Sequence, residues 1–431
     1  MGSTGKTEDV KDIDLVEKEF KMRIAVIGAG ASGLVAIKYC IQDGHDCEAF
    51  EQTESLGGTW NYTDDVGLDK NGLPIHTSMY KHLRTNLPKE LMLFDDFQYP
   101  EGLKESFISQ NEVLQYLNNY ADKMNLRKYI RFLTQVTYVQ PIDDNKWDIE
   151  IQDVISKEKI RKIFDAVICC NGKYSVPYMP HIPGLDSFSG NCIHSHNYRS
   201  EEPYRDKTVL VIGAGPSGVD ICSHLSRVAK KVLLSMKSSP FFKASYGIVE
   251  KVPLKEIIGK KGVFEDQSIE LIDDIIMCTG YVYNYPFLSE KCQITVDDNY
   301  VRGLYKEIVC VEYPTLIVMG IPGRICPFPT FGLQMRFVMK MLKGEYHLPS
   351  REKMIKEIQK EREDKNCANR HFHNKGVEGE LMYWIDLAES ANVEGIPKVF
   401  SKLHAHVIQH KRDVKKGYRI LNEEEFQEYD I

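Results

Sequence analysis

Residues 23–33 read RIAVIGAGASG, and this stretch decides the fold. Its first five residues form a short apolar run, which predicts a buried parallel strand. The strand leads directly into Gly28, Gly30 and Gly33, spaced as G-x-G-x-x-G, and residues 34–42 continue with the apolar periodicity of a helix. The first glycine permits a tight turn, the second lets a pyrophosphate approach the backbone, and the third lets helix and strand pack closely. The stretch therefore predicts a dinucleotide-binding turn.

The residues that follow strengthen this prediction. Ala31 and Ser32 complete the turn at the start of the helix, where free backbone N–H groups can bind phosphate. Cys47–Phe50 is predicted to be the second strand, and it ends at Glu51, where an acidic side chain can bind the ribose hydroxyls. A lone glycine motif would be equally compatible with a purely structural turn. The complete strand–turn–helix–strand context favours a nucleotide site.

The same pattern recurs after a predicted strand at 208–212. The candidate contacts of this second unit are Gly213, Gly215, Pro216, Ser217, Gly218 and Asp220. Where an acidic residue would select a free ribose, the chain has Ser235 and Lys237. A hydroxyl and a cation accommodate a 2′-phosphate, so the second unit is predicted to bind NADP, with Lys237 as a plain surface lysine the alternative. Two units in one chain suggest that NADPH passes hydride to FAD held by the first unit.

Composition excludes several other functions. The chain has 431 residues and a net charge of -7 with both signs spread along it, unlike the basic footprint of a nucleic-acid binder. Its 11 cysteines include no C-x-x-C pair, which argues against a disulfide scaffold, a redox-active disulfide or a zinc site, so no metal is predicted. No run approaches the ~18 apolar residues of a membrane span. We expect a soluble protein, cytoplasmic or, if a leader preceded this sequence, secreted.

A specific family resemblance lies between the two glycine motifs. Residues 188–199 read FSGNCIHSHNYR. They resemble the F-x-G-x-x-x-H-x-x-x-[FYW] fingerprint of class B flavoprotein monooxygenases. Tyr198 at its last position resembles the flavin-containing monooxygenases rather than the Baeyer–Villiger branch, which usually has Trp there.

Four further segments resemble motifs of this family in the expected order. They are residues 56–62 (LGGTWNY), 79–90 (MYKHLRTNLPKE), 278–281 (CTGY) and 329–336 (PTFGLQMR). The resemblance implies FAD or NADP contacts at Gly58, Thr59, Trp60, Thr85, Leu87, Val136, Thr279, Gly280, Tyr281, Thr330 and Gln334. It also implies that Asn86 lies beside flavin and nicotinamide and acts as the catalytic side chain, with a turn asparagine as the alternative. His194 is expected to orient the domains rather than to act as an acid or base.

The resemblance implies a two-domain α/β fold of the glutathione-reductase type with two Rossmann-type units. We expect a flexible arm over 1–21, an FAD domain over 22–203 that resumes over 325–431 with a helical C-terminus, and an NADP domain over 204–324. A compact chain without a C-terminal membrane helix resembles the soluble insect enzymes, including pyrrolizidine-alkaloid N-oxygenases.

The implied activity is oxygenation of a soft nucleophile by a C4a-hydroperoxyflavin, with NADPH and O₂ consumed. A tertiary amine, such as an alkaloid, converted to its N-oxide is the first expectation. A Baeyer–Villiger enzyme and a non-catalytic FAD/NADP sensor are the alternatives, and homo-oligomer formation is left open.

Overall fold

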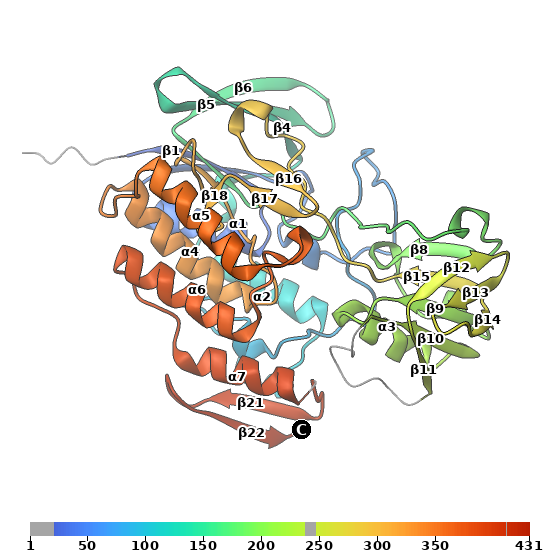
Figure 1. Ribbon diagram of the computed structural model, residues 1–431. Helices are drawn as coiled ribbons and strands as arrows, with labels where there is room; N and C mark the ends of the chain where they lie inside the picture. The colour runs from blue at the N-terminus through green and yellow to red at the C-terminus, as the bar shows by residue number, and fades with distance from the viewer. Residues whose placement is uncertain (1–20, 238–246, 411) are drawn as a thin grey trace, which may run out of the picture.

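The computed structural model describes residues 21–237, 247–410 and 412–431. The chain forms a larger body, on the left of Figure 1, and a smaller one on the right. Each body is built on a mainly parallel sheet, and one strand of each sheet leads into one of the two glycine motifs. The two-domain α/β fold predicted from the sequence is confirmed. The predicted arm over 1–21 falls, apart from its last residue, outside the described residues.

The sheet of the larger body has the strand order β18-β19-β20-β7-β1-β2-β3. Its strands are β1 (Arg23–Ile27), β2 (Asp46–Phe50), β3 (Ile130–Arg131), β7 (Ala166–Cys169), β18 (Leu304–Tyr305), β19 (Val309–Cys310) and β20 (Leu316–Val318). Strand β1 lies centrally, parallel to both β2 and β7. Side chains alternate along a strand, so Ile24 and Val26 pack into the helix-side core and Ala25 and Ile27 into a second core on the opposite face.

Helices cover one face of this sheet. They are α1 (Ala31–Gln42), α2 (Gln110–Lys123), α4 (Pro327–Leu342), α5 (Arg351–Lys365), α6 (Gly376–Ala391) and α7 (Lys398–Gln409). Helix α1 lies against β1 and β2, α4 against α1, α6 against α4, and α7 against α6. Ser109 and Glu112 form a reciprocal capping box that fixes the start of helix α2.

An antiparallel sheet covers the opposite face, at the top of Figure 1. Its strands are β4 (Thr134–Ile142), β5 (Lys146–Asp153) and β6 (Lys159–Phe164). Trp147 and Phe164 are fully buried between this sheet and the first one, in the core that holds Ala25 and Ile27.

The smaller body repeats this plan. Its parallel sheet has the order β11-β10-β9-β15-β8 and comprises β8 (Asn191–His194), β9 (Thr208–Ile212), β10 (Lys231–Ser235), β11 (Ile248–Lys251) and β15 (Asp274–Met277). Helix α3 (Pro216–Leu225) covers one face. The antiparallel strands β12 (Leu254–Ile258), β13 (Lys261–Phe264) and β14 (Ile269–Leu271) cover the other.

Three segments differ from the sequence expectations. Residues 173–203, which fall within the range expected for the FAD domain, contribute β8 to the smaller body's sheet because β8 pairs in parallel with β15. Strands β18–β20 lie in the larger body's sheet, although they fall within the range expected for the NADP domain. The expected helical C-terminus ends in a hairpin of β21 (Lys416–Ile420) and β22 (Phe426–Asp430), a strand pairing that helical periodicity could not reveal. A further hairpin, β16 (Thr295–Asp297) with β17 (Tyr300–Arg302), precedes β18.

Two further observations bear on the composition arguments. Among the described residues, no helix combines the length and apolarity needed to cross a membrane. All eleven cysteines fall in described segments as free thiols, and of these only Cys367 is exposed.

Candidate active site

The first glycine turn is shaped by close backbone contacts. Gly28 has φ +103°, and a Cβ there would lie 2.6 Å from the carbonyl oxygen of Cys170 at the end of β7. A Cβ on Gly33 would lie 2.0 Å from the carbonyl oxygen of Gly28. Real Cβ atoms do not approach a carbonyl this closely, so both positions require glycine. The turn therefore places the N-terminus of α1, with Ala31 and Ser32 in its first turn, at the carboxyl end of strand β1.

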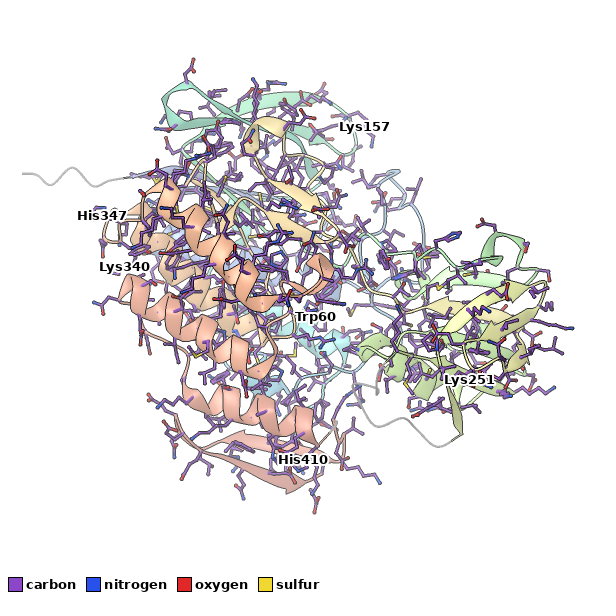
Figure 2. All side chains as sticks on the ribbon, in the orientation of Figure 1. Trp60, Lys157, Lys251, Lys340, His347 and His410 are labelled. Carbon is purple, nitrogen blue, oxygen red and sulfur yellow. The ribbon has the colours of Figure 1, made fainter. Side chains whose placement is uncertain are left out.

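The second predicted FAD segment packs directly on this turn. The N–H of Gly57 donates to the carbonyl of Ala29 at 3.0 Å. The position of a Cβ on Gly58 lies 3.0 Å from the Cα of Gly30, so the two backbones touch. Thr59 and Trp60 follow in a short 3-10 helix, and Trp60 is partly buried against the helix-side core (Figure 2). The two segments that the sequence predicts to contact FAD are thus neighbours.

Glu51 ties the end of β2 to the glycine turn. Its carboxylate is almost fully buried and accepts the N–H of Ala29 at 2.9 Å through Oε2. Oε1 accepts both the N–H and the hydroxyl of Thr53, at 2.9 and 2.8 Å. Strand β4 starts beside it, since the N–H of Thr134 donates to the carbonyl of Glu51, and buried Val136 lies two residues farther on. These bonds fix an acceptor where a ribose hydroxyl is expected.

The second glycine turn repeats the geometry of the first. Gly213 has φ +108°, with a Cβ position 2.4 Å from the carbonyl oxygen of Cys278, and a Cβ on Gly218 would lie 1.9 Å from that of Gly213. Gly215 differs, because nothing lies within 4 Å of its Cβ position. Helix α3 begins with Pro216 and Ser217 after Gly215, and no side chain caps it. Its free N–H groups and the open space fit a pyrophosphate.

The structure contradicts one residue of the NADP prediction, Ser235 at the end of β10. The Ser235 hydroxyl is buried, donates to the carbonyl of Val252 at 3.1 Å and accepts the N–H of Leu254 at 3.0 Å. A serine has one hydroxyl proton, so Ser235 has none left for a phosphate. Lys237 is exposed two residues later and stays the candidate reader of a 2′-phosphate.

The fingerprint segment connects the two bodies. The Arg199 guanidinium donates to the carbonyls of Asp65, Met79 and His196, at distances between 2.8 and 3.3 Å. His194 accepts the N–H of His196 at 3.0 Å through Nδ1. Burial, with the nearby His196 ring, lowers the pKa of His194 to about 4, so its imidazole is neutral near pH 7. The role expected of His194 in orienting the domains stays a prediction.

Tyr281 lies at the junction of these segments. Its ring contacts the rings of His194 and His196 edge-on, with centroids 5.1 and 5.8 Å away. Burial raises the pKa of its hydroxyl to about 12, against hydrogen bonds with Ser78 and Ser195. Ser78 in turn lies 3.4 Å from the hydroxyl of Thr59. The CTGY segment is thus linked to the segment that carries Thr59 and Trp60.

Thr279 and Gly280 of the CTGY segment shape its turn. The Thr279 hydroxyl donates to the carbonyl of Tyr178, and Gly280 has φ +86° with open space at its Cβ position.

Asn86 has an exposed side chain between two buried neighbours, Thr85 and Leu87. Thr85 anchors the segment, because its N–H donates to the carbonyl of Ile108 and its hydroxyl accepts the N–H of Ile108. A backbone held in this way leaves the Asn86 amide facing outward, as a ligand contact requires. Its catalytic role stays a prediction.

Three predicted cofactor contacts have partners within the protein. Asp220 accepts the Tyr80 hydroxyl at 2.6 Å and Arg412 at 2.8 Å. On α4, the Thr330 hydroxyl donates to the carbonyl of Cys326 and accepts the indole N–H of Trp384. The Gln334 amide donates to Tyr383, and its Oε1 is a buried acceptor without a hydrogen-bond partner. Thr330 and Gln334 therefore bind side chains of α6.

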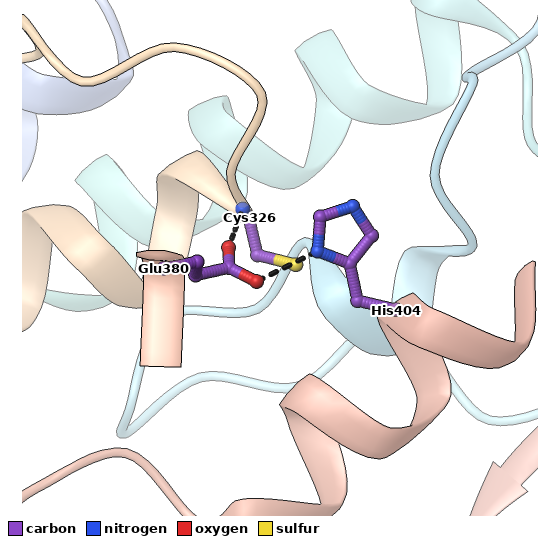
Figure 3. Close-up of side chains that lie close together, drawn as sticks. All are labelled: Cys326, Glu380 and His404. Carbon is purple, nitrogen blue, oxygen red and sulfur yellow. Dashed lines mark hydrogen bonds and ion pairs between the residues drawn. The ribbon is translucent and has the colours of Figure 1, made fainter. Parts of the chain in front are cut away.

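A buried cluster that the sequence did not reveal lies at the start of α4. Cys326, Glu380 and His404 offer ligand atoms within 4.8 Å of one another (Figure 3). Glu380 accepts the backbone N–H of Cys326, and its other oxygen lies 2.7 Å from Nδ1 of His404. Because protein groups satisfy both carboxylate oxygens, the cluster is explained as a bracing contact between α4, α6 and α7. Three separate elements supply its members, and no local motif joins them.

Comparison with known proteins is consistent with this site. The family described as "Flavin-binding monooxygenase-like" matches residues 21–245 and 243–405. Flavin-containing monooxygenase FMO GS-OX-like 4 of Arabidopsis thaliana is 38% identical over 379 residues, covering 82% of this chain and 84% of its own. Senecionine N-oxygenase of Tyria jacobaeae is 36% identical over 345 residues, covering 78% and 74%. The structure of S-allyl-L-cysteine S-oxygenase from Allium sativum has a TM-score of 0.84 at 33% identity, covering 90% and 92%.

Proposed function

This chain belongs to the flavin-binding monooxygenase-like family and is an enzyme that uses FAD and NADPH. From that premise we propose that it oxygenates a soft nucleophile. The proposed substrates carry an amine nitrogen or a sulfide sulfur, with a tertiary amine converted to its N-oxide as the first choice. FAD, when bound, accepts hydride from NADPH and activates O₂ for transfer of one oxygen atom.

One observation carries the proposal: two glycine cradles are joined by the hydrogen-bonded fingerprint segment. Arg199 and Tyr281 connect the segments that flank both cradles, so two dinucleotides can act on each other in one chain. Gly30 and Glu51 would hold the FAD pyrophosphate and ribose. Gly215 and Lys237 would hold the pyrophosphate and 2′-phosphate of NADPH.

The substrate class is supported by chemistry and by the named relatives. An oxygen donor of this kind is electrophilic and needs a lone pair on the substrate but no protein nucleophile. The relatives include one protein named as an N-oxygenase and another named as an S-oxygenase. Tyr198 in the fingerprint favours these heteroatom reactions over oxygen insertion beside a ketone.

A product screen tests the proposal. The purified enzyme with NADPH is given a tertiary amine, a sulfide and a ketone, and products are analysed by mass spectrometry for one added oxygen. We expect amine and sulfide products and none from the ketone. Gly218→Ala, which should not bind NADPH, is the control. A product from the ketone alone would favour the Baeyer–Villiger activity, and NADPH oxidation without any oxygenated product would overturn the proposal.

A further inference from the structure

The two bodies meet at a buried contact outside both glycine cradles. Asp220 lies on α3, five residues after Gly215, and its partner Tyr80 belongs to the core cluster of the smaller body, which leaves Arg412 as the contact that reaches the larger body. Oδ2 of Asp220 accepts the hydroxyl of Tyr80 at 2.6 Å, and its Oδ1 accepts Nη1 of Arg412 at 2.8 Å. The side chains of Asp220 and Arg412 are only 12% and 8% exposed, so solvent screens this ion pair little.

Each partner of Asp220 belongs to a segment that is fixed elsewhere. The ring of Tyr80 packs edge-on against Tyr198 of the fingerprint and His224 of α3, with centroids 5.3 and 5.7 Å away. The neighbouring N–H of Lys81 donates to the carbonyl of Arg199. Tyr80 is therefore held between the fingerprint and α3, where its hydroxyl donates to Asp220.

Arg412 reaches the same point from the C-terminal segment. Its Nη2 donates to the carbonyl of Arg84 at 3.2 Å, two residues before Asn86, and its guanidinium lies 5.7 Å from the ring of Phe107. The hairpin that follows is anchored on the larger body, where the N–H of Tyr418 donates to Ser106 at 2.8 Å. One guanidinium thus contacts both the helix that begins at the second cradle and the backbone that leads to Asn86.

We propose that Tyr80, Asp220 and Arg412 form an interdomain latch, in which Asp220 and Arg412 are positioning residues. The latch holds the N-terminus of α3, and with it the NADPH cradle, in register with the segment that carries Asn86. Because hydride transfer needs reacting atoms about 3–3.5 Å apart, a small rotation of the smaller body would slow it. The family match ends at residue 405, so the C-terminal part of the latch lies beyond the matched region.

Hydrogen–deuterium exchange tests the latch without relying on turnover. Peptides covering residues 79–86 and 216–225 are compared between the parent protein, Arg412→Ala and Tyr80→Phe. We expect faster exchange in both peptides in both variants, because each loses one arm of the contact to Asp220. Arg419→Ala, an exposed arginine of the same hairpin, is the matched control and should leave both peptides unchanged.

Kinetics provide the second measurement. Anaerobic reduction of bound FAD by NADPH should slow about tenfold in Arg412→Ala and Tyr80→Phe, and Arg412→Lys should recover part of the rate. FAD content should be unchanged. This step requires no substrate, so its result is independent of whether amines or sulfides are oxygenated.

Two outcomes would overturn the latch. One is faster exchange confined to residues 412–431, which would make Arg412 a local support of the hairpin. The other is an unchanged rate of FAD reduction in Tyr80→Phe. This variant removes only a hydroxyl, so it tests the latch even if Arg412→Ala does not fold.

Discussion

The two nucleotide-binding units are built alike and differ in what surrounds the turn. In each, a glycine Cβ would lie within 2.0 Å of a carbonyl oxygen, at Gly33 and Gly218, and each sheet is covered by a helix on one face and an antiparallel sheet on the other. In the first unit, Gly58 packs on Gly30 and Glu51 braces the turn. In the second, Gly215 faces open space. An enclosed cradle suits a retained cofactor, and an open cradle suits a cosubstrate that exchanges at every turnover.

The ends of the second strands differ as well. Glu51 presents a fixed carboxylate, whereas Ser235 uses its proton inside the protein and leaves the exposed Lys237, two residues later, as the candidate cation. If the proposed contacts hold, the glycine turn specifies a dinucleotide and the side chain after the second strand selects which one.

The largest effect is expected for substitution of Asn86, which is predicted to lie beside both flavin and nicotinamide. Asn86→Ala should lower product formation by about 10²–10³, the usual loss when a preorganised donor is removed. FAD content should be unchanged, because the first cradle is intact. NADPH oxidation should fall far less than product formation, and the difference should appear as hydrogen peroxide.

Product, NADPH loss and peroxide are measured together. Asn86→Asp should fail as well, since a carboxylate cannot donate a hydrogen bond at neutral pH. If Asn86→Ala stays tightly coupled with normal product formation, Asn86 is only a turn residue and the units meet through another group.

Matched alanine substitutions separate the two cradles. Gly33→Ala and Gly218→Ala create nearly equal backbone clashes, 2.0 and 1.9 Å. Overpacking of about 1–3 kcal/mol corresponds to roughly five- to hundredfold in affinity. Gly33→Ala should therefore lose the yellow flavin absorbance, whereas Gly218→Ala should stay yellow but no longer be reduced by NADPH. Each variant is the control for the other, and loss of FAD from both would refute the assignment.

A smaller effect is expected at Lys237. Lys237→Ala should raise KM for NADPH about tenfold, because a charge-assisted contact to the 2′-phosphate is lost. KM for NADH should change little. Initial rates with both cofactors provide the measurement, with the exposed Lys230→Ala as the control lysine of the same domain. Equal responses to NADPH and NADH would show that Lys237 does not read the phosphate.

The smallest effect concerns His194, the last residue of β8 in the smaller body. Burial lowers its pKa to about 4, from an ordinary value of ~6.5, so the unfolded chain binds more protons between these pH values. Stability should therefore fall as pH drops from about 6.5 toward 4. His194→Asn should flatten this slope in urea unfolding, and the exposed His347→Asn should not. An identical slope in all three proteins would contradict the expectation.

Local sequence was sufficient for the repeated parts of the molecule. Strand β1, the turn at Gly28 and helix α1 are specified by residues adjacent in sequence, so apolar periodicity and glycine spacing predict them. The same holds for β9, Gly213 and α3. The membership of β8 in the second sheet was missed because a short strand among Pro, Gly and His residues carries no clear period.

Contacts between distant residues could not be predicted. Asp220 and Arg412 are 192 positions apart, and neither lies in a pattern that names the other. Ser235 was expected to contact NADP, because its residue type fits, but the contact with Val252 that uses its proton is a tertiary feature. Residue type suggests a chemistry, and the fold decides which groups are already occupied.

The distribution of cysteines has a practical consequence for measuring the distance between the two bodies by fluorescence. Cys367 is the exposed thiol among eleven, and Cys192 is partly covered. A maleimide dye should therefore attach at Cys367, on the larger body between α5 and α6, without prior removal of native thiols. One added cysteine on the smaller body would complete a donor–acceptor pair for single-molecule fluorescence.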